Sequence, residues 1–118
     1  MSLAADLVIA LVALLHAYFL VLEMFLWDKP AGLKAFGQTL EAAKSSKVLA
    51  ANQGLYNGFL AAGLVWGLSM GAAGTSVKVF FLVCVLVAGV YGAITASRKI
   101  LLVQALPAGI ALALLALS

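Results

Sequence analysis

Polar side chains that could do chemistry are few in this chain, and most fall within or at the ends of long apolar stretches. They comprise one histidine, one glutamate, one arginine, one threonine and a group of amides and tyrosines. The set is His16, Glu23, Asn52, Gln53, Tyr56, Asn57, Tyr91, Thr95, Arg98 and Gln104. Because an ionisable group in apolar surroundings is costly, such residues usually face a protein interior or a hydrated cavity. The pattern therefore predicts a polar layer inside an otherwise apolar protein.

Glu23 and His16 have the greatest chemical potential in this set, and they are the candidate catalytic residues. They are seven positions apart, so on a helix they share a face. A carboxylate in apolar surroundings can take up a proton or bind a cation, and an imidazole can act as a general base or a proton relay. Two structural alternatives remain open. Glu23 could form a buried ion pair with Arg98, and His16 could be a hydrogen-bonded core residue.

Other kinds of site have little support in the sequence. A metal centre needs about three or four protein ligands, and His16, Glu23 and Asn52 are too few. The sequence lacks G-x-S-x-G, H-E-x-x-H and a phosphate-binding glycine loop. Cys84 is the single cysteine, so it cannot form an intrachain disulfide, and we interpret it as a small buried hydrophobe. We therefore expect no metal, the cofactor stays unknown, and the sequence does not decide whether the protein is an enzyme.

Composition places the chain in a membrane. Of its 118 residues, 66% are hydrophobic and 9% are charged, and the mean hydropathy is +1.21. Soluble domains are only about half apolar and about a quarter charged. The net charge of +3 comes from residues in the connections between apolar stretches, so it indicates topology and not nucleic-acid binding. The lipid bilayer is the expected partner.

The length of the apolar stretches predicts an all-α polytopic membrane protein, a single four-helix domain over residues 1–118. A span needs about 20 apolar residues, and in lipid the backbone must satisfy its own hydrogen bonds. The predicted spans are about 4–27, 47–70, 77–97 and 100–117. The first is read as a retained span and not a signal peptide, because residues 1–6 contain no Lys or Arg. Pro107 should kink the last span.

The connection after the first span, residues 28–46, has its own pattern. Asp28 followed by Lys29 and Pro30 is typical of a helix start with Asp28 as the N-cap. Apolar residues then recur at helical spacing, with charged residues between them. This predicts a short amphipathic helix over about 31–44 that lies in the membrane interface. The alternative is an ordinary connector.

The lysines and arginines predict the orientation. Four spans place both termini on one side. Loops 28–46 and 98–99 share the other side. In these loops and at the start of the second span, that side holds Lys29, Lys34, Lys44, Lys47, Arg98 and Lys99, whereas the side of the termini holds only Lys78. The positive-inside rule therefore predicts a multi-pass cell-membrane protein with cytoplasmic loops and with both termini outside.

Depth along the helices groups the polar residues. With a rise of about 1.5 Å per residue, a shallow cytoplasmic layer contains Glu23, Asn52, Gln53, Thr95, Arg98 and Gln104. A layer about 10–16 Å deep contains His16, Tyr56, Asn57 and Tyr91. The outer halves, residues 60–68, 79–87 and 112–117, are almost wholly apolar. We expect a pocket open to the cytoplasm, in which Glu23 and Arg98 lie on facing helices and communicate through Asn52 or Gln53.

Small residues at four-residue spacing mark the second and third spans. They are Gly54, Gly58 and Ala62, then Gly63 and Gly67, then Ala88, Gly92 and Ala96. Such spacing lets helices approach closely. Packing within one chain explains it, and the seam of a homodimer is the alternative.

Several of these segments resemble one family. They are residues 16–27 from His16 to Trp27, the Asn52-Gln-Gly-Leu-Tyr-Asn-Gly58 motif, residues 92–98 from Gly92 to Arg98, and Gln104 with Pro107-Ala108. Together they are similar to the domain of unknown function 1304 family of small four-helix membrane proteins. The resemblance covers nearly the whole chain. It implies the four-helix fold and a shared polar site, and no established activity.

Three functions remain open at this stage. The first is a membrane protein whose cytoplasm-facing pocket binds a small or amphipathic ligand, with acid–base chemistry by Glu23 and His16. The second is a small proton-coupled transporter that works as a homodimer, because small multidrug exporters have a similar size and one glutamate in the first helix. The third is a structural or assembly protein whose polar layer only joins helices.

Overall fold

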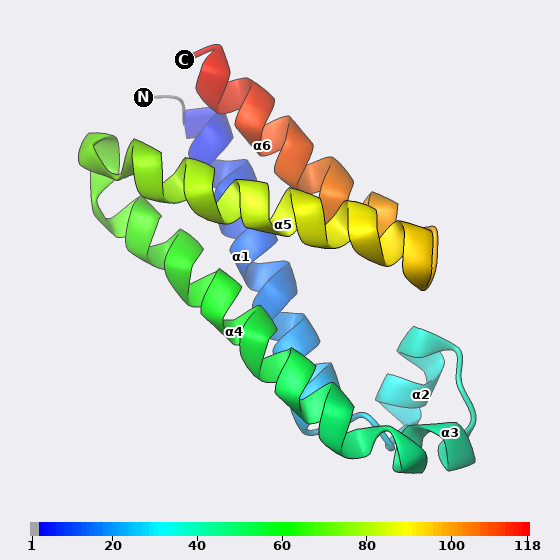
Figure 1. Ribbon diagram of the computed structural model, residues 1–118. Helices are drawn as coiled ribbons and strands as arrows, with labels where there is room; N and C mark the ends of the chain where they lie inside the picture. Colours follow the sequence, from blue (N-terminus) through cyan, green and yellow to red (C-terminus); the bar gives the residue numbers. More distant parts are fainter. Residues whose placement is uncertain (1–2) are drawn as a thin grey trace. The chain divides into compact units, whose positions relative to one another are not determined.

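The structure, a computed structural model, describes residues 3–118, and their regular secondary structure is helical throughout (Figure 1). This confirms the all-α prediction. The helices are α1 (Leu3–Met24), α2 (Pro30–Phe36), α3 (Leu40–Ser45), α4 (Lys47–Ser69), α5 (Thr75–Thr95) and α6 (Leu106–Ala116), with a 3-10 turn at Gly71–Gly74 and a π-helical turn at Leu101–Ala105. The chain forms two compact units. One contains residues 15–59, and the other contains residues up to 14 together with residues 60–118.

Among residues 3–118, two helical segments are long and apolar enough to cross a membrane. They are Leu3–Met24 and Gly71–Thr95, and Leu101–Ala116 is a shorter apolar helix. Helix α4 has 23 residues and is as long as α1. It is less apolar because it carries Asn52, Gln53 and Asn57. Two of the predicted spans thus have both the length and the composition of membrane helices.

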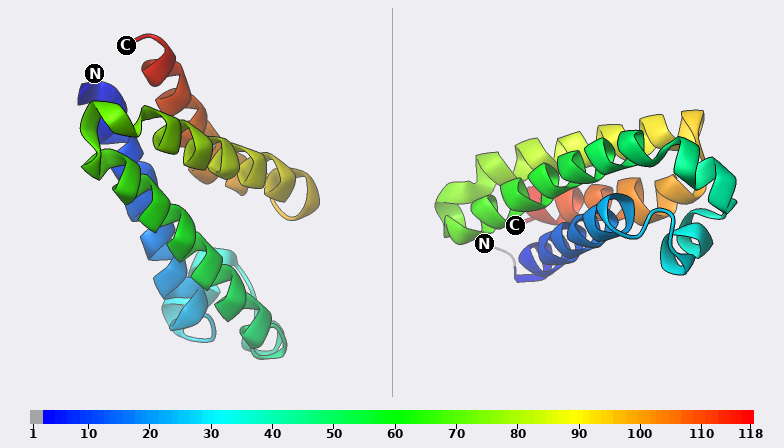
Figure 2. Two further views of the ribbon diagram at one scale, coloured as in Figure 1. Left: turned by 60° about the vertical axis from the view of Figure 1, so that its left-hand side comes forward. Right: turned by 90° about the horizontal axis from the view of Figure 1, so that it is seen from below.

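The unit of residues up to 14 and 60–118 has an apolar core. Its members come from the first part of α1, the second part of α4, and from α5 and α6. They are Ile9, Val12, Ala13, Leu64, Leu82, Val85, Ala108 and Ala111, and each is at most 5% exposed. Helix α1 begins and α6 ends at the same end of this unit (Figures 1 and 2).

A partly buried ion pair lies in this unit. Lys78 Nζ donates to Asp6 Oδ1 at 3.0 Å and to the Gly71 carbonyl oxygen at 3.4 Å. The Lys78 side chain is completely buried, although its sequence position at the start of an apolar stretch suggested a surface loop charge. Asp6 also lies in the first turn of α1, where the positive end of the helix dipole stabilises a carboxylate. Gly67 leaves room for this lysine, because an added Cβ would lie 2.9 Å from Lys78 Cγ.

Close backbone contact joins α5 to the chain that follows it. A Cβ added at Gly89 would lie 2.6 Å from the Ala105 backbone nitrogen, so only glycine fits there. Ala105 ends the π-helical turn, in which the Leu106 N–H donates to the Leu101 carbonyl oxygen. Pro107 then sits in the first turn of α6, where its missing N–H costs little. The predicted irregularity near Pro107 is therefore a π turn before the proline.

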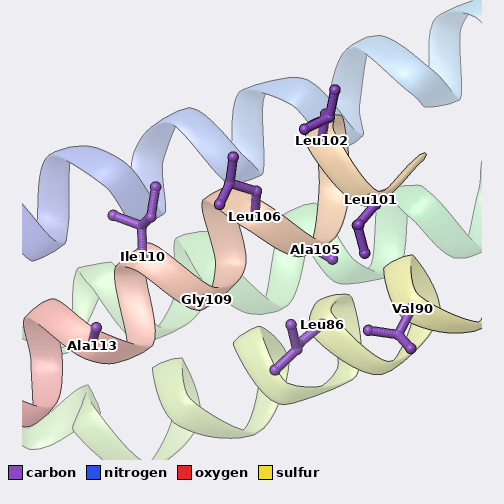
Figure 3. Close-up of a pocket in the computed structure, with 9 residues that line it drawn as sticks. All are labelled: Leu86, Val90, Leu101, Leu102, Ala105, Leu106, Gly109, Ile110 and Ala113. Atoms are coloured by element: carbon purple, nitrogen blue, oxygen red, sulfur yellow. The ribbon is translucent and has the colours of Figure 1, made fainter. Parts of the chain in front are cut away.

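An open groove of about 430 Å³ runs along α5, the π-helical turn and α6 (Figure 3). Its walls are formed by leucine, isoleucine and valine side chains such as Leu86 and Ile110, and Gly109 leaves its floor open. All of its lining residues are apolar or glycine. The predicted polar residues are absent from its walls, so this groove suits a hydrocarbon chain and is not the predicted polar pocket.

In the unit of residues 15–59, the segment predicted as one interfacial helix over 31–44 forms two helices, α2 and α3. Gly37 ends α2 in the left-handed region with φ 60°, and its N–H donates to the Leu33 carbonyl oxygen. Thr39 then caps α3 by accepting a hydrogen bond from the Ala42 N–H. A left-handed glycine followed by an N-cap residue breaks the helix, and the apolar periodicity alone does not reveal that break.

The base of this segment is tied to the ends of α1 and α4. Trp27 Nε1 donates to Ser46 Oγ at 3.1 Å, and Lys47 Nζ donates to Asp28 Oδ2 at 3.1 Å. The Lys47 hydrogen bond holds the pKa of the Asp28 carboxyl below its usual value. The prediction that Asp28 caps the helix was wrong, because Lys29 occupies the N-cap position of α2 and the Asp28 carboxylate is engaged by Lys47.

The contact at Gly89 gives a testable expectation. Gly89→Ala should lower the melting temperature in detergent, because overpacking costs about 1–3 kcal/mol and exceeds the helix-propensity gain of about 1 kcal/mol. Gly109→Ala is the matched control: it makes the same change in α6, where nothing lies within 4 Å of an added Cβ. That variant should melt at or above the wild-type temperature. Equal effects of the two substitutions would contradict the described contact.

Candidate functional site

The centre of the candidate site is a side-chain pair between α1 and α4 in the unit of residues 15–59. Asn57 Nδ2 donates a hydrogen bond to Glu23 Oε1. The Glu23 residue is 7% exposed, and Asn57 is partly buried. An ionised carboxylate can only accept hydrogen bonds, and its two oxygens offer about four acceptor positions. One amide donor therefore leaves Glu23 with acceptor capacity for a proton, a cation or a further donor.

Two glycines of α4 position this pair. A Cβ added at Gly54 would lie 2.8 Å from Met24 Cγ and 3.0 Å from Glu23 Cβ, and one added at Gly58 would lie 2.5 Å from Leu20 Cδ1. The two glycines are four residues apart, so they form one face against α1. Asn57 lies beside that face, within reach of the Glu23 carboxylate. The predicted Gly54-xxx-Gly58 stripe thus packs helices within the chain.

His16 is completely buried on α1 in the same unit. Its ring meets the edge of Phe19 with the ring centroids 5.3 Å apart. Seven residues separate it from Glu23, which is about 10 Å along the helix axis. This exceeds hydrogen-bond reach. Proton exchange between the two residues would therefore pass through an intervening water molecule or ligand.

The other polar residues predicted on α4 flank this pair. Asn52, Gln53 and Tyr56 are exposed within their unit, and Tyr56 is 57% exposed. The Asn52 side chain donates to the Val48 carbonyl oxygen of its own helix at 2.9 Å. The residue that reaches Glu23 is therefore Asn57, and not Asn52 or Gln53 as the depth argument suggested. The reason is that Gly54 and Gly58 turn the Asn57 side of α4 toward α1.

The remaining predicted residues belong to the other unit. Tyr91 is 68% exposed on α5, and the Thr95 hydroxyl donates to the Tyr91 carbonyl oxygen at 2.8 Å. Arg98 is exposed in the connection after α5, and Gln104 is half-buried in the π-helical turn. Within each unit, the structure brings together Glu23 with Asn57 and Tyr91 with Thr95.

The pairing of Asp6 with Lys78 was not predicted from the sequence. Both residues lie near the ends of apolar stretches, and the predicted topology already put those ends on the same side. Their location on the same predicted side was the signal in the sequence that could have indicated this pair. Lys78 was instead counted as a loop charge, because its separation of 72 residues from Asp6 gives no local pattern.

Comparison with known proteins places the chain in a family. The family described as "Protein of unknown function (DUF1304)" matches residues 10–116. The chain belongs to this family. The match includes Glu23, Asn57 and the glycines between α1 and α4, and it confirms the resemblance seen in the sequence motifs.

A relative from Lactococcus lactis subsp. lactis (strain IL1403), described as "Uncharacterized protein YpaA", is 31% identical over 96 residues. The match covers 80% of this chain and 81% of that protein. No solved structure matches the chain.

The Glu23–Asn57 hydrogen bond can be measured by a double-mutant cycle. Glu23→Leu should leave the Asn57 amide without its acceptor, and Asn57→Leu should leave the carboxylate without its donor. The double variant removes both groups, so it should lose less stability than the two single variants together. The expected coupling is about 1 kcal/mol. Unfolding in detergent micelles, followed by tryptophan fluorescence, would measure it.

Asn52→Leu is the matched control for this cycle, because the Asn52 side chain donates to the Val48 carbonyl oxygen of its own helix. Combined with Glu23→Leu, it should show additive losses. Additive losses for Asn57 as well would mean that the pair contributes no coupling.

Proposed function

We propose that this protein crosses the membrane four times and binds an amphipathic cation at Glu23. The proposed spans are α1, α4, α5, and the π-helical turn with α6. Support comes from the apolar length of α1 and of Gly71–Thr95, and from the 23 residues of α4, which would extend about 34 Å. Helices α2 and α3 would lie at the membrane surface.

The proposed orientation has both termini outside and residues 28–46 in the cytoplasm. Lysine and arginine are concentrated in the two connections assigned to the cytoplasm. Burial of Lys78 against Asp6 strengthens the asymmetry, because the only lysine on the other side is already paired. The shared end of α1 and α6 fits an even number of crossings.

Cysteine labelling in intact cells would test this orientation. In a Cys84→Ala background, Thr75→Cys should react with a membrane-impermeant maleimide and Lys34→Cys should not. Both positions are exposed in the structure, and both should react after lysis, which is the control. Labelling of Lys34→Cys alone in intact cells would reverse the topology, and labelling of both would contradict a membrane-crossing chain.

The partly buried hydrogen bond between Glu23 and Asn57 carries the ligand proposal. A carboxylate in apolar surroundings that can still accept hydrogen bonds suits a positively charged group of a ligand. The apolar side chains of the surrounding helices suit an apolar ligand body. Gln53 and Tyr56, which flank Asn57 on α4, are exposed polar groups that would be costly against lipid. We therefore assign them to the wall of a hydrated ligand site. His16 would exchange protons there only through the ligand or water.

Tetraphenylphosphonium, a cation with an apolar body, is a suitable probe. It should raise the melting temperature of the wild-type protein in detergent, because a ligand that binds only the folded state stabilises it by mass action. Glu23→Gln should abolish this shift, since it removes the charge. The glutamine oxygen can still accept from Asn57, so the unliganded protein should melt close to the wild type.

Glu41→Gln is the control, because it removes an exposed carboxylate from α3. It should leave the shift unchanged, and triphenylphosphine oxide, which is neutral, should produce no shift. Stabilisation that persists in Glu23→Gln would contradict the proposal. An absence of any shift in the wild type would contradict it too, and would favour a purely structural role for the pair.

A further inference from the structure

The surface of helices α2 and α3 carries more exposed lysine side chains than exposed acidic side chains. Lys29, Lys34 and Lys44 are exposed, and the exposed acid among residues 29–45 is Glu41. The nearby Asp28 carboxylate is already held by Lys47 at 3.1 Å. We infer that this surface, called the lysine surface here and defined by Lys29, Lys34 and Lys44, binds the phosphate headgroups of anionic phospholipids. The inference rests on the membrane location proposed above, but not on ligand binding at Glu23.

Apolar residues on the same segment suit a membrane interface. Phe36 is 41% exposed and Leu40 is 46% exposed, at the end of α2 and the start of α3. Trp27 packs against Phe36 with ring centroids 4.8 Å apart. Exposed apolar side chains beside lysines are the composition of a segment that inserts into the boundary between headgroups and acyl chains. The neighbouring tryptophan is also typical of that depth.

The segment is anchored firmly enough to present one face. Gly32 of α2 and Ala43 of α3 are buried. A Cβ at Gly32 would lie 1.9 Å from the Leu26 carbonyl oxygen, so α2 packs directly against the turn that follows α1. With the ties from Trp27 to Ser46 and from Lys47 to Asp28, the segment is fixed at both ends. The lysine surface is therefore held in place relative to the α1–α4 pair.

Helix stability does not account for all three lysines. Lys34 and Lys44 lie in the last turns of α2 and α3, where the negative end of the helix dipole stabilises a positive charge. Lys29 occupies the N-cap position of α2 and makes no capping hydrogen bond with its side chain. A positive charge at a helix N-terminus is unfavourable. Asp28 interacts electrostatically with Lys29, but its carboxylate is hydrogen-bonded to Lys47, so an anionic headgroup would add a further opposite charge at Lys29.

Membrane electrostatics sets the size of the expected effect. Each lysine close to an anionic membrane surface raises the affinity for that surface about fivefold, and the effect decays over the Debye length. Loss of two lysines should therefore reduce the preference for anionic lipid strongly. The preference should also weaken as salt is raised, because the lysine surface is exposed.

Trp27 provides a reporter at the lysine surface. The chain has two tryptophans, so Trp66→Phe leaves Trp27 alone. This variant would be reconstituted in bilayers that contain phosphatidylcholine and phosphatidylglycerol, with bromine on the acyl chains of one or the other. Brominated phosphatidylglycerol should quench Trp27 more than an equal fraction of brominated phosphatidylcholine. Lys34→Gln with Lys44→Gln should remove that difference, and Lys34→Arg with Lys44→Arg should keep it. Glu41→Gln should increase it.

The outcomes separate the two proposals. Equal quenching by both lipids in the unaltered lysine surface would overturn the headgroup inference and leave the membrane location intact. No quenching by either lipid would overturn the membrane location itself. Inorganic phosphate should reduce the preference no more than sodium chloride at the same ionic strength. A larger effect of phosphate would assign the lysine surface to a free anion and overturn its assignment to lipid.

Discussion

Close approach of α4 to its neighbours is the constraint on which both partly buried polar pairs, Glu23–Asn57 and Asp6–Lys78, depend. At Gly54 and Gly58 the helix backbone lies against Leu20, Glu23 and Met24 of α1, and Asn57 meets the carboxylate beside that contact. At Gly67 the backbone lies against Lys78, which pairs with Asp6. Apolar packing alone gives little direction to helices in lipid, so close backbone contact and polar pairs decide which faces meet. Glycine is needed here for its size.

The all-α fold and the limits of most helices could be predicted, because apolar length is a direct signal of helices that suit a membrane. Residues 47–70 were expected as one helix, and α4 covers Lys47–Ser69. The break in the connecting segment could not be predicted in the same way. It depends on the left-handed backbone of Gly37, and a periodic apolar pattern continues across it without change.

The candidate site was predicted in part. Glu23 and His16 were identified as unusual because an isolated ionisable residue in an apolar stretch needs no alignment to be noticed, and both are buried. Asn57 was placed in a deeper layer than Glu23, although its amide reaches the carboxylate. Depth counted along each helix assumes parallel axes and side chains that extend sideways, and real side chains reach along the axis by about a turn. Lys78 was missed because pairing over 72 residues leaves no local trace.

The Asp6–Lys78 pair also has a consequence for biosynthesis. The ribosome completes Asp6 long before Lys78, and the two are 72 residues apart. In the proposed membrane topology, the Asp6 carboxylate lacks its Lys78 partner until α5 has been made, and a charged group without its partner favours a hydrated position over the bilayer interior. Arrival of the third long helix then neutralises the carboxylate and fixes the start of the first. In that topology, the contact that holds the start of α1 through Asp6 can form only after α5 has been made.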